Sequence, residues 1–78
     1  MRITLNGESK EVAQDLSVGK LLKQLDLQPD RVAVEINLNI LERSMYQSWV
    51  LTEGDRVEII SFIGGGSLFP TMTLETNL

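Results

Sequence analysis

Residues 17–25 read SVGKLLKQL, a pattern that predicts the main helix of the chain. Ser17 suits the N-cap, since its hydroxyl can accept a hydrogen bond from a free amide of the first helical turn. Apolar residues then recur at the i, i+3, i+4, i+7 spacing of one buried face: Val18, Leu21, Leu22 and Leu25. Pro29 disfavours helix beyond residue 28. The stretch therefore predicts an amphipathic helix of about two to three turns.

The residues before this helix predict a β-hairpin. In RITLNGESKEVA (residues 2–13), Asn6 and Gly7 form a dipeptide that tolerates positive φ at both central positions of a tight turn. Ile3 and Leu5 alternate with polar residues, and Val12 faces the same side from the returning strand. The hairpin therefore has one apolar face.

Three further strands are predicted after the helix. RVAVEIN (residues 31–37) and RVEIISFI (residues 56–63) show the alternation expected of half-buried strands. A short strand is predicted at Ile40–Leu41, and the weakly periodic ERSMYQSW (residues 42–49) predicts one irregular or 3₁₀ turn. The element order is hairpin, helix, strand, short strand, strand.

This order predicts an α+β fold of the β-grasp (ubiquitin-like) class, a mixed sheet of four to five strands with one main helix across one face. A helix that connects two strands of one sheet makes a right-handed crossover and packs its apolar side on the sheet. The predicted core consists of the residues that face this interface: Ile3, Leu5, Val12, Val18, Leu21, Leu22, Leu25, Val32, Val34, Ile36, Val57 and Ile59.

The composition restricts the class of function. The chain has 78 residues, a net charge of −4 and neither cysteine nor histidine. Without thiolates and imidazoles, the commonest nucleophiles, bases and metal ligands are missing, which argues against an intrinsic enzyme. Seven scattered basic residues make no phosphate-binding patch, and no apolar run reaches the ~20 residues that span a bilayer. We expect a cytoplasmic, single-domain monomer with no nucleic-acid or membrane partner.

The alternation of residues in the last predicted strand indicates which of its side chains face away from the helix. Glu58 is expected to face water, which directs Ile60 and Phe62 to the same outer side. One interpretation is that Ile60 and Phe62 form an exposed apolar docking surface. The other is that they are covered by a residue of the preceding irregular segment: Met45, Tyr46 or Trp49.

Three consecutive glycines, Gly64, Gly65 and Gly66, follow this strand. Composition alone favours a flexible linker. The alternative is a thin arm that enters a narrow catalytic tunnel of another protein, because glycine allows close backbone approach. We expect residues 1–66 to form the domain with its glycine tail, and residues 67–78 to form a flexible extension.

Residues 1–66 resemble the ThiS family of sulfur-carrier proteins, which serve thiazole formation in thiamine biosynthesis. The resemblance rests on four segments: the LNG hairpin, SVGKLLKQL, VAVEINLNILERSMYQSWVL and EGDRVEIISFIGGG. Any one of them is common, but their order and spacing together are specific.

The resemblance implies a role for the glycines. A ThiF-type adenylating enzyme would use ATP to activate a terminal carboxylate at Gly66, and a sulfurtransferase relay would convert it to a thiocarboxylate. A ThiG-type thiazole synthase would then accept the sulfur. Under this interpretation Glu58, Ile60 and Phe62 contact the adenylating partner, while the carrier has no catalytic residue and no bound cofactor of its own.

The sequence departs from the family pattern after Gly66. Residues 67–78 put an amide where the mechanism needs a carboxylate. Three interpretations stay open: the residues are trimmed in the cell, they are foreign to the natural protein, or carrier function has been lost and a non-covalent β-grasp interaction module remains. The nearest alternative family is the small subunit of molybdopterin synthase, which shares the fold and the Gly-Gly end.

Overall fold

The computed structural model describes residues 1–62. It contains five strands, one α-helix and two single turns of 3₁₀ helix, in this order along the chain: β1 (Arg2–Leu5), β2 (Glu8–Glu11), α1 (Val18–Gln24), η1 (Pro29–Arg31), β3 (Val32–Ile36), β4 (Asn39–Leu41), η2 (Arg43–Met45) and β5 (Arg56–Ser61). Gly64, Gly65, Gly66 and the extension at residues 67–78 lie outside the described residues.

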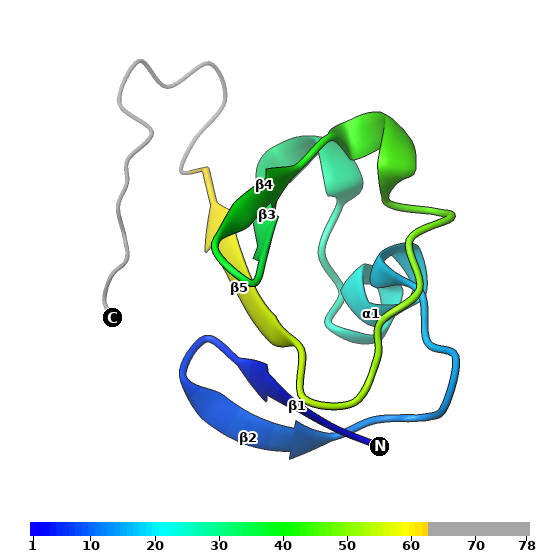
Figure 1. Cartoon of the computed structure of the whole chain (residues 1–78). Helices are drawn as coiled ribbons and strands as arrows, with labels where there is room; N and C mark the ends of the chain where they lie inside the picture. Colours follow the sequence, from blue (N-terminus) through cyan, green and yellow to red (C-terminus); the bar gives the residue numbers. More distant parts are fainter. Residues whose placement is uncertain (63–78) are drawn as a thin grey trace.

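The five strands form one mixed sheet in the order β2-β1-β5-β3-β4. β5 lies in the middle, parallel to β1 and antiparallel to β3, and the two remaining pairs are antiparallel hairpins. Helix α1 packs across one face of this sheet (Figure 1). The predicted β-grasp arrangement is confirmed.

Helix α1 begins as predicted. The Ser17 hydroxyl oxygen accepts a hydrogen bond from the Lys20 amide at 3.1 Å, and Val18, Leu21 and Leu22 are fully buried. The helix is slightly shorter than the apolar pattern suggested, because Leu25 already serves as its C-cap. Leu25 is therefore only partly buried at the margin of the core.

The core follows the predicted pattern with additions from the irregular segments. Nine of the twelve predicted residues are buried, and Leu5, Leu25 and Ile59 pack against the core from its edge. The sequence pattern missed four buried residues that lie outside the long periodic stretches: Leu16, Leu41, Tyr46 and Leu51.

Long-range main-chain hydrogen bonds hold three of these missed residues in the core, Leu16, Tyr46 and Leu51. The Leu51 amide donates to the Leu16 carbonyl at 2.8 Å, and the Gly19 amide donates to the Tyr46 carbonyl at 2.9 Å. Residues 46–51 therefore lie along the start of α1, on the helix-bearing side of the sheet. Within residues 1–62, no helix has the length and apolar character needed to cross a membrane.

Candidate functional site

The face of the sheet opposite α1 carries the outer residues predicted for β5. Val57 is fully buried toward the helix, whereas Glu58 and Ile60 alternate with it and are half-buried. The Phe62 amide donates to the Arg31 carbonyl at 3.0 Å. This bond continues the pairing of β5 with β3 by one step, because Arg31 directly precedes β3. Phe62 is half-buried as well and follows the same alternation as Ile60.

Strands β3 and β4 extend this surface. Ala33 is paired with Ile60, Glu35 with Glu58, and Ile40 with Glu35, so all five side chains share one face. Ile40 is 76% exposed, which is unusual for a large apolar residue on a strand. We refer to this surface as the outer patch, which consists of Ala33, Glu35, Ile40, Glu58, Ile60 and Phe62.

The outer patch combines apolar side chains with two carboxylates, Glu35 and Glu58. Glu35 and Glu58 are directly opposite each other across β3 and β5, an arrangement of like charges that disfavours the sheet. The Arg56 Nε lies 4.0 Å from the Glu58 carboxylate, at the outer limit of an ion pair, and water reaches 58% of the Arg56 side chain and 37% of the Glu58 side chain. A partner surface with apolar groups and Lys or Arg side chains would complement the outer patch.

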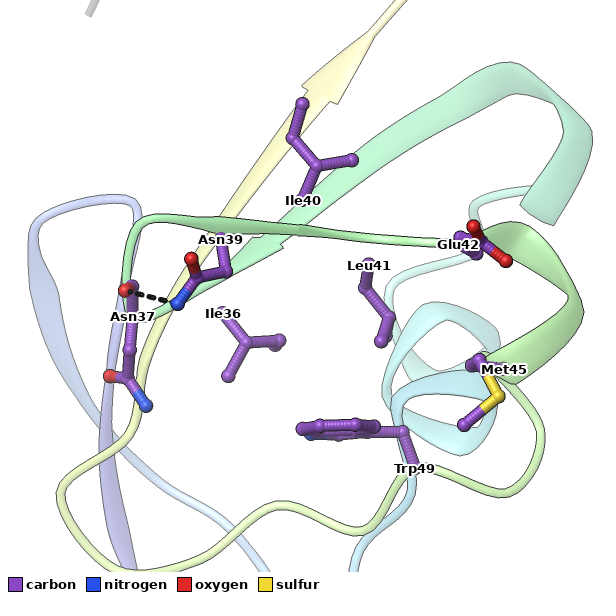
Figure 2. A pocket seen from close by; sticks show the side chains of 8 residues that line it. All are labelled: Ile36, Asn37, Asn39, Ile40, Leu41, Glu42, Met45 and Trp49. Atoms are coloured by element: carbon purple, nitrogen blue, oxygen red, sulfur yellow. Dashed lines mark hydrogen bonds between the residues drawn. The ribbon is translucent and has the colours of Figure 1, made fainter.

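The irregular segment does not cover this patch, so the interpretation that it shields Ile60 and Phe62 is wrong. Tyr46 is only 3% exposed and belongs to the core on the helix side. Met45 and Trp49 line a groove of about 320 Å³ along β4. Figure 2 shows both side chains beside this groove, which Ile40 also lines from the other side of β4.

Tyr46 has a perturbed pKa but a structural role. Burial raises the pKa of its hydroxyl, and the nearby Arg43 guanidinium lowers it in part. The hydroxyl donates a buried hydrogen bond to the Val32 carbonyl at 3.2 Å. The described residues also contain no group of three or more carboxylate-type ligands that could hold a metal ion. Tyr46 therefore belongs to the core and not to the outer patch.

The outer patch includes the residue that lies two positions before the first of the three glycines. β5 ends at Ser61, and the described chain ends at Phe62, which belongs to the patch. The three glycines follow within four residues in the sequence. A protein that binds the outer patch would therefore be close to the start of the glycine tail.

The family model for the ThiS family matches residues 3–66 of the chain. The chain belongs to the ThiS family. This ThiS match spans every described strand and helix except the edge of β1, and it extends through all three glycines. Residues 67–78 lie outside it.

Individual relatives of this ThiS chain agree with the family match. The sulfur carrier protein ThiS of Escherichia coli is 30% identical over 66 residues, which is 85% of this chain and 100% of that protein. The crystal structure of the thiamine biosynthesis protein ThiS from Geobacter metallireducens superposes with a TM-score of 0.73 at 39% identity. It covers 85% of this chain and 100% of its own.

Two relatives are much longer than this ThiS chain. The thiazole synthases of Paramagnetospirillum magneticum and Magnetococcus marinus are 40% and 41% identical over 67 and 66 residues, or 86% and 85% of this chain. The chain spans 21% and 20% of their lengths, so about a fifth of each protein is similar to it.

The sequence pattern missed three members of the outer patch, Ala33, Glu35 and Ile40. A signal for Ile40 was present in the tight connection before it. Asn37 and Leu38 both have positive φ, 52° and 74°, as a two-residue hairpin turn requires. That turn places Ile40 opposite Glu35.

Proposed function

We propose that the chain is a protein sulfur carrier of thiamine biosynthesis, a co-substrate of other enzymes rather than a catalyst. The observation that carries this proposal is the ThiS family match, which continues without interruption from the folded sheet through Gly66. The fold similarity to a solved ThiS protein supports it. The named relatives favour this assignment over the small subunit of molybdopterin synthase.

The proposed chemistry takes place at Gly66, once it is the terminal residue. A ThiF-type enzyme catalyses attack of the terminal carboxylate oxygen on the α-phosphorus of ATP, which forms an acyl adenylate and releases pyrophosphate. A sulfur nucleophile from a sulfurtransferase relay then attacks the acyl carbon and displaces AMP. Activation is needed because a free carboxylate is a poor electrophile. ATP is bound by the partner, and the carrier supplies only the acyl group and a surface for recognition.

We assign recognition of the adenylating partner to the outer patch. It carries the exposed Ile40 beside the half-buried Ile60, and the half-buried Phe62 precedes the glycines in the sequence. The paired carboxylates of Glu35 and Glu58 favour a partner with basic side chains around an apolar centre. Phe62→Ala should weaken partner binding more than it lowers the unfolding midpoint.

The acceptor of the sulfur is proposed to be a ThiG-type thiazole synthase. The supporting observation is that two proteins named thiazole synthase contain a segment about 40% identical to this chain. A carrier domain and a synthase within one polypeptide meet at a high effective concentration. The same two components on separate chains need a docking surface instead.

Residues 67–78 are incompatible with this chemistry while they are attached. The Gly66 carbonyl is then part of an amide, and no carboxylate oxygen is available to attack ATP. We propose that these residues are absent from the carrier that reacts. Analysis of the protein from its native host by intact mass would show whether a species ends at Gly66.

The test is pyrophosphate exchange with a ThiF-type enzyme and ATP. The chain ending at Gly66 should support exchange, the 78-residue chain should not, and Gly66→Ala in the shorter chain should be impaired because a methyl group crowds a narrow channel. Exchange by the uncleaved 78-residue chain at the same rate would contradict the terminal-glycine mechanism. If no variant exchanges with a competent enzyme, the non-covalent interaction module becomes the better hypothesis.

A further inference from the structure

Two asparagine side chains bind the backbone of β5, one near each end. Asn37 accepts a hydrogen bond from the Arg56 amide at 2.9 Å, at the start of the strand. Asn6 accepts one from the Ile59 amide at 2.8 Å and donates another to the Ile59 carbonyl at 3.3 Å, near the end of the strand. Both asparagines have positive φ, 48° at Asn6 and 52° at Asn37.

Asn6 takes the place of a missing strand partner. The last main-chain bond between β1 and β5 runs from the Asn6 amide to the Val57 carbonyl, at 2.9 Å. The chain then turns away through Gly7, whose φ is 85°. Ile59 is the next residue of β5 whose amide and carbonyl point to this side. Among the described strands none lies opposite Ile59 on this side, and the carboxamide of Asn6 satisfies both groups.

The two sides of β5 consequently end at different positions. On the β3 side the pairing runs through Ser61, and the Phe62 amide adds one more bond to Arg31. On the β1 side, among residues 1–62, the bonds of Asn6 to Ile59 are the last. Within the described part of the chain, Asn6 is therefore the final restraint on that side of β5.

We infer that Asn6 is a positioning residue for the carrier reaction, an inference that rests on the proposed function. Ile59 lies between Glu58 and Ile60 of the outer patch, so the Asn6 bonds fix the strand from which both the docking residues and the tail extend. Without them the end of β5 can splay from β1. A carrier docked through its outer patch would then present its terminal carboxylate out of place. Displacements of about 1 Å can cost on the order of 100-fold in rate.

Three variants isolate this effect. Asn6→Gly removes the carboxamide but keeps a residue that tolerates the positive φ of the turn. Asn37→Gly is the matched control, since it makes the same change at a residue with nearly the same φ, at the far end of β5. Asn6→Asp retains the acceptor for the Ile59 amide and loses the donor to its carbonyl.

The first measurement is structural and uses the 78-residue chain. Amide hydrogen exchange at Ile59 should accelerate about five- to tenfold in Asn6→Gly and stay unchanged in Asn37→Gly. Residual dipolar couplings of the Ser61 and Phe62 amides should decrease only in Asn6→Gly. Unchanged couplings in Asn6→Gly would overturn the inference, whether or not the chain is a sulfur carrier.

The second measurement is pyrophosphate exchange with the chain ending at Gly66. This shorter chain keeps the whole described sheet, helix and core, and the solved ThiS structure consists of the matching part alone. Asn6→Gly should lower kcat about tenfold with KM within about twofold, because docking persists while the carboxylate is misplaced. Asn6→Asp should be intermediate, and Asn37→Gly should stay within about twofold of the unmodified chain.

The outcomes separate the inference from the proposed function. If the unmodified short chain exchanges and Asn6→Gly exchanges equally well, or falls no further than Asn37→Gly, Asn6 has only a structural role and the inference is wrong. If the unmodified short chain does not exchange at all, the proposed function fails. The dipolar couplings then decide the inference, with a selective decrease in Asn6→Gly supporting it and no decrease overturning it.

Discussion

Replacing Ile40 by serine removes the most exposed large apolar side chain of the outer patch. Ile40 is 76% exposed and lies on β4 opposite Glu35. Because so little of its surface is buried, the substitution should change the free energy of unfolding by no more than about 0.5 kcal/mol. Any larger effect on partner binding therefore reports on the docked surface rather than on the fold.

The size of the binding effect follows from the area that docking can bury. Complete burial of an isoleucine side chain contributes about 1.5–3 kcal/mol. With about three quarters of the residue available to a partner, docking over Ile40 should gain about 1–2 kcal/mol. The Kd for the ThiF-type enzyme should therefore rise about five- to thirtyfold in Ile40→Ser.

The assay is calorimetric titration of the enzyme with the chain ending at Gly66, alongside urea unfolding followed through Trp49, the single tryptophan. Leu38→Gly is the matched control, since Leu38 is 73% exposed but lies in the turn before β4. Its Kd should stay within about twofold. Equal Kd values for the unmodified chain and Ile40→Ser, or equal losses in Ile40→Ser and Leu38→Gly, would refute the assignment of the outer patch.

Three further predictions concern the fold. Leu22→Ala should lower the free energy of unfolding in urea by about 2–5 kcal/mol, because Leu22 is fully buried. Replacing the exposed Lys23 by alanine should leave the free energy of unfolding almost unchanged. A loss near zero for Leu22→Ala would mean that the helix face is misassigned. Leu38→Gly should raise the free energy of unfolding by about 1 kcal/mol, since leucine at a φ of 74° is strained; a lower midpoint would contradict this. For Tyr46 the folded pKa is raised above its ordinary value of 10.0, so the stability it contributes is complete below about pH 10 and is lost as the pH rises through the folded pKa. Between pH 9 and pH 11, the free energy of unfolding of Tyr46→Phe should therefore fall less than that of the unmodified chain. Equal decreases in the two proteins would contradict this prediction.

Interactions between residues close together in the sequence specify several elements of the fold. The face of α1 follows from the spacing of Val18, Leu21 and Leu22, and its start follows from the Ser17 cap. The β1–β2 turn follows from Asn6 and Gly7. These features are local, because periodicity and turn chemistry act over a few residues. The membership in the ThiS family also rests on sequence.

Which residues from distant segments meet depends on the packing of the whole domain. Tyr46 and Leu51 are buried because long-range hydrogen bonds lay their segment along α1, and no period in the sequence marks them. The opposition of Glu35 and Glu58 depends on the register between β3 and β5, which neither strand encodes alone. The bonds of Asn6 to Ile59 join residues 53 positions apart. Such pairings are set by the packing of the whole sheet, because a strand's alternation specifies its faces but not its neighbours.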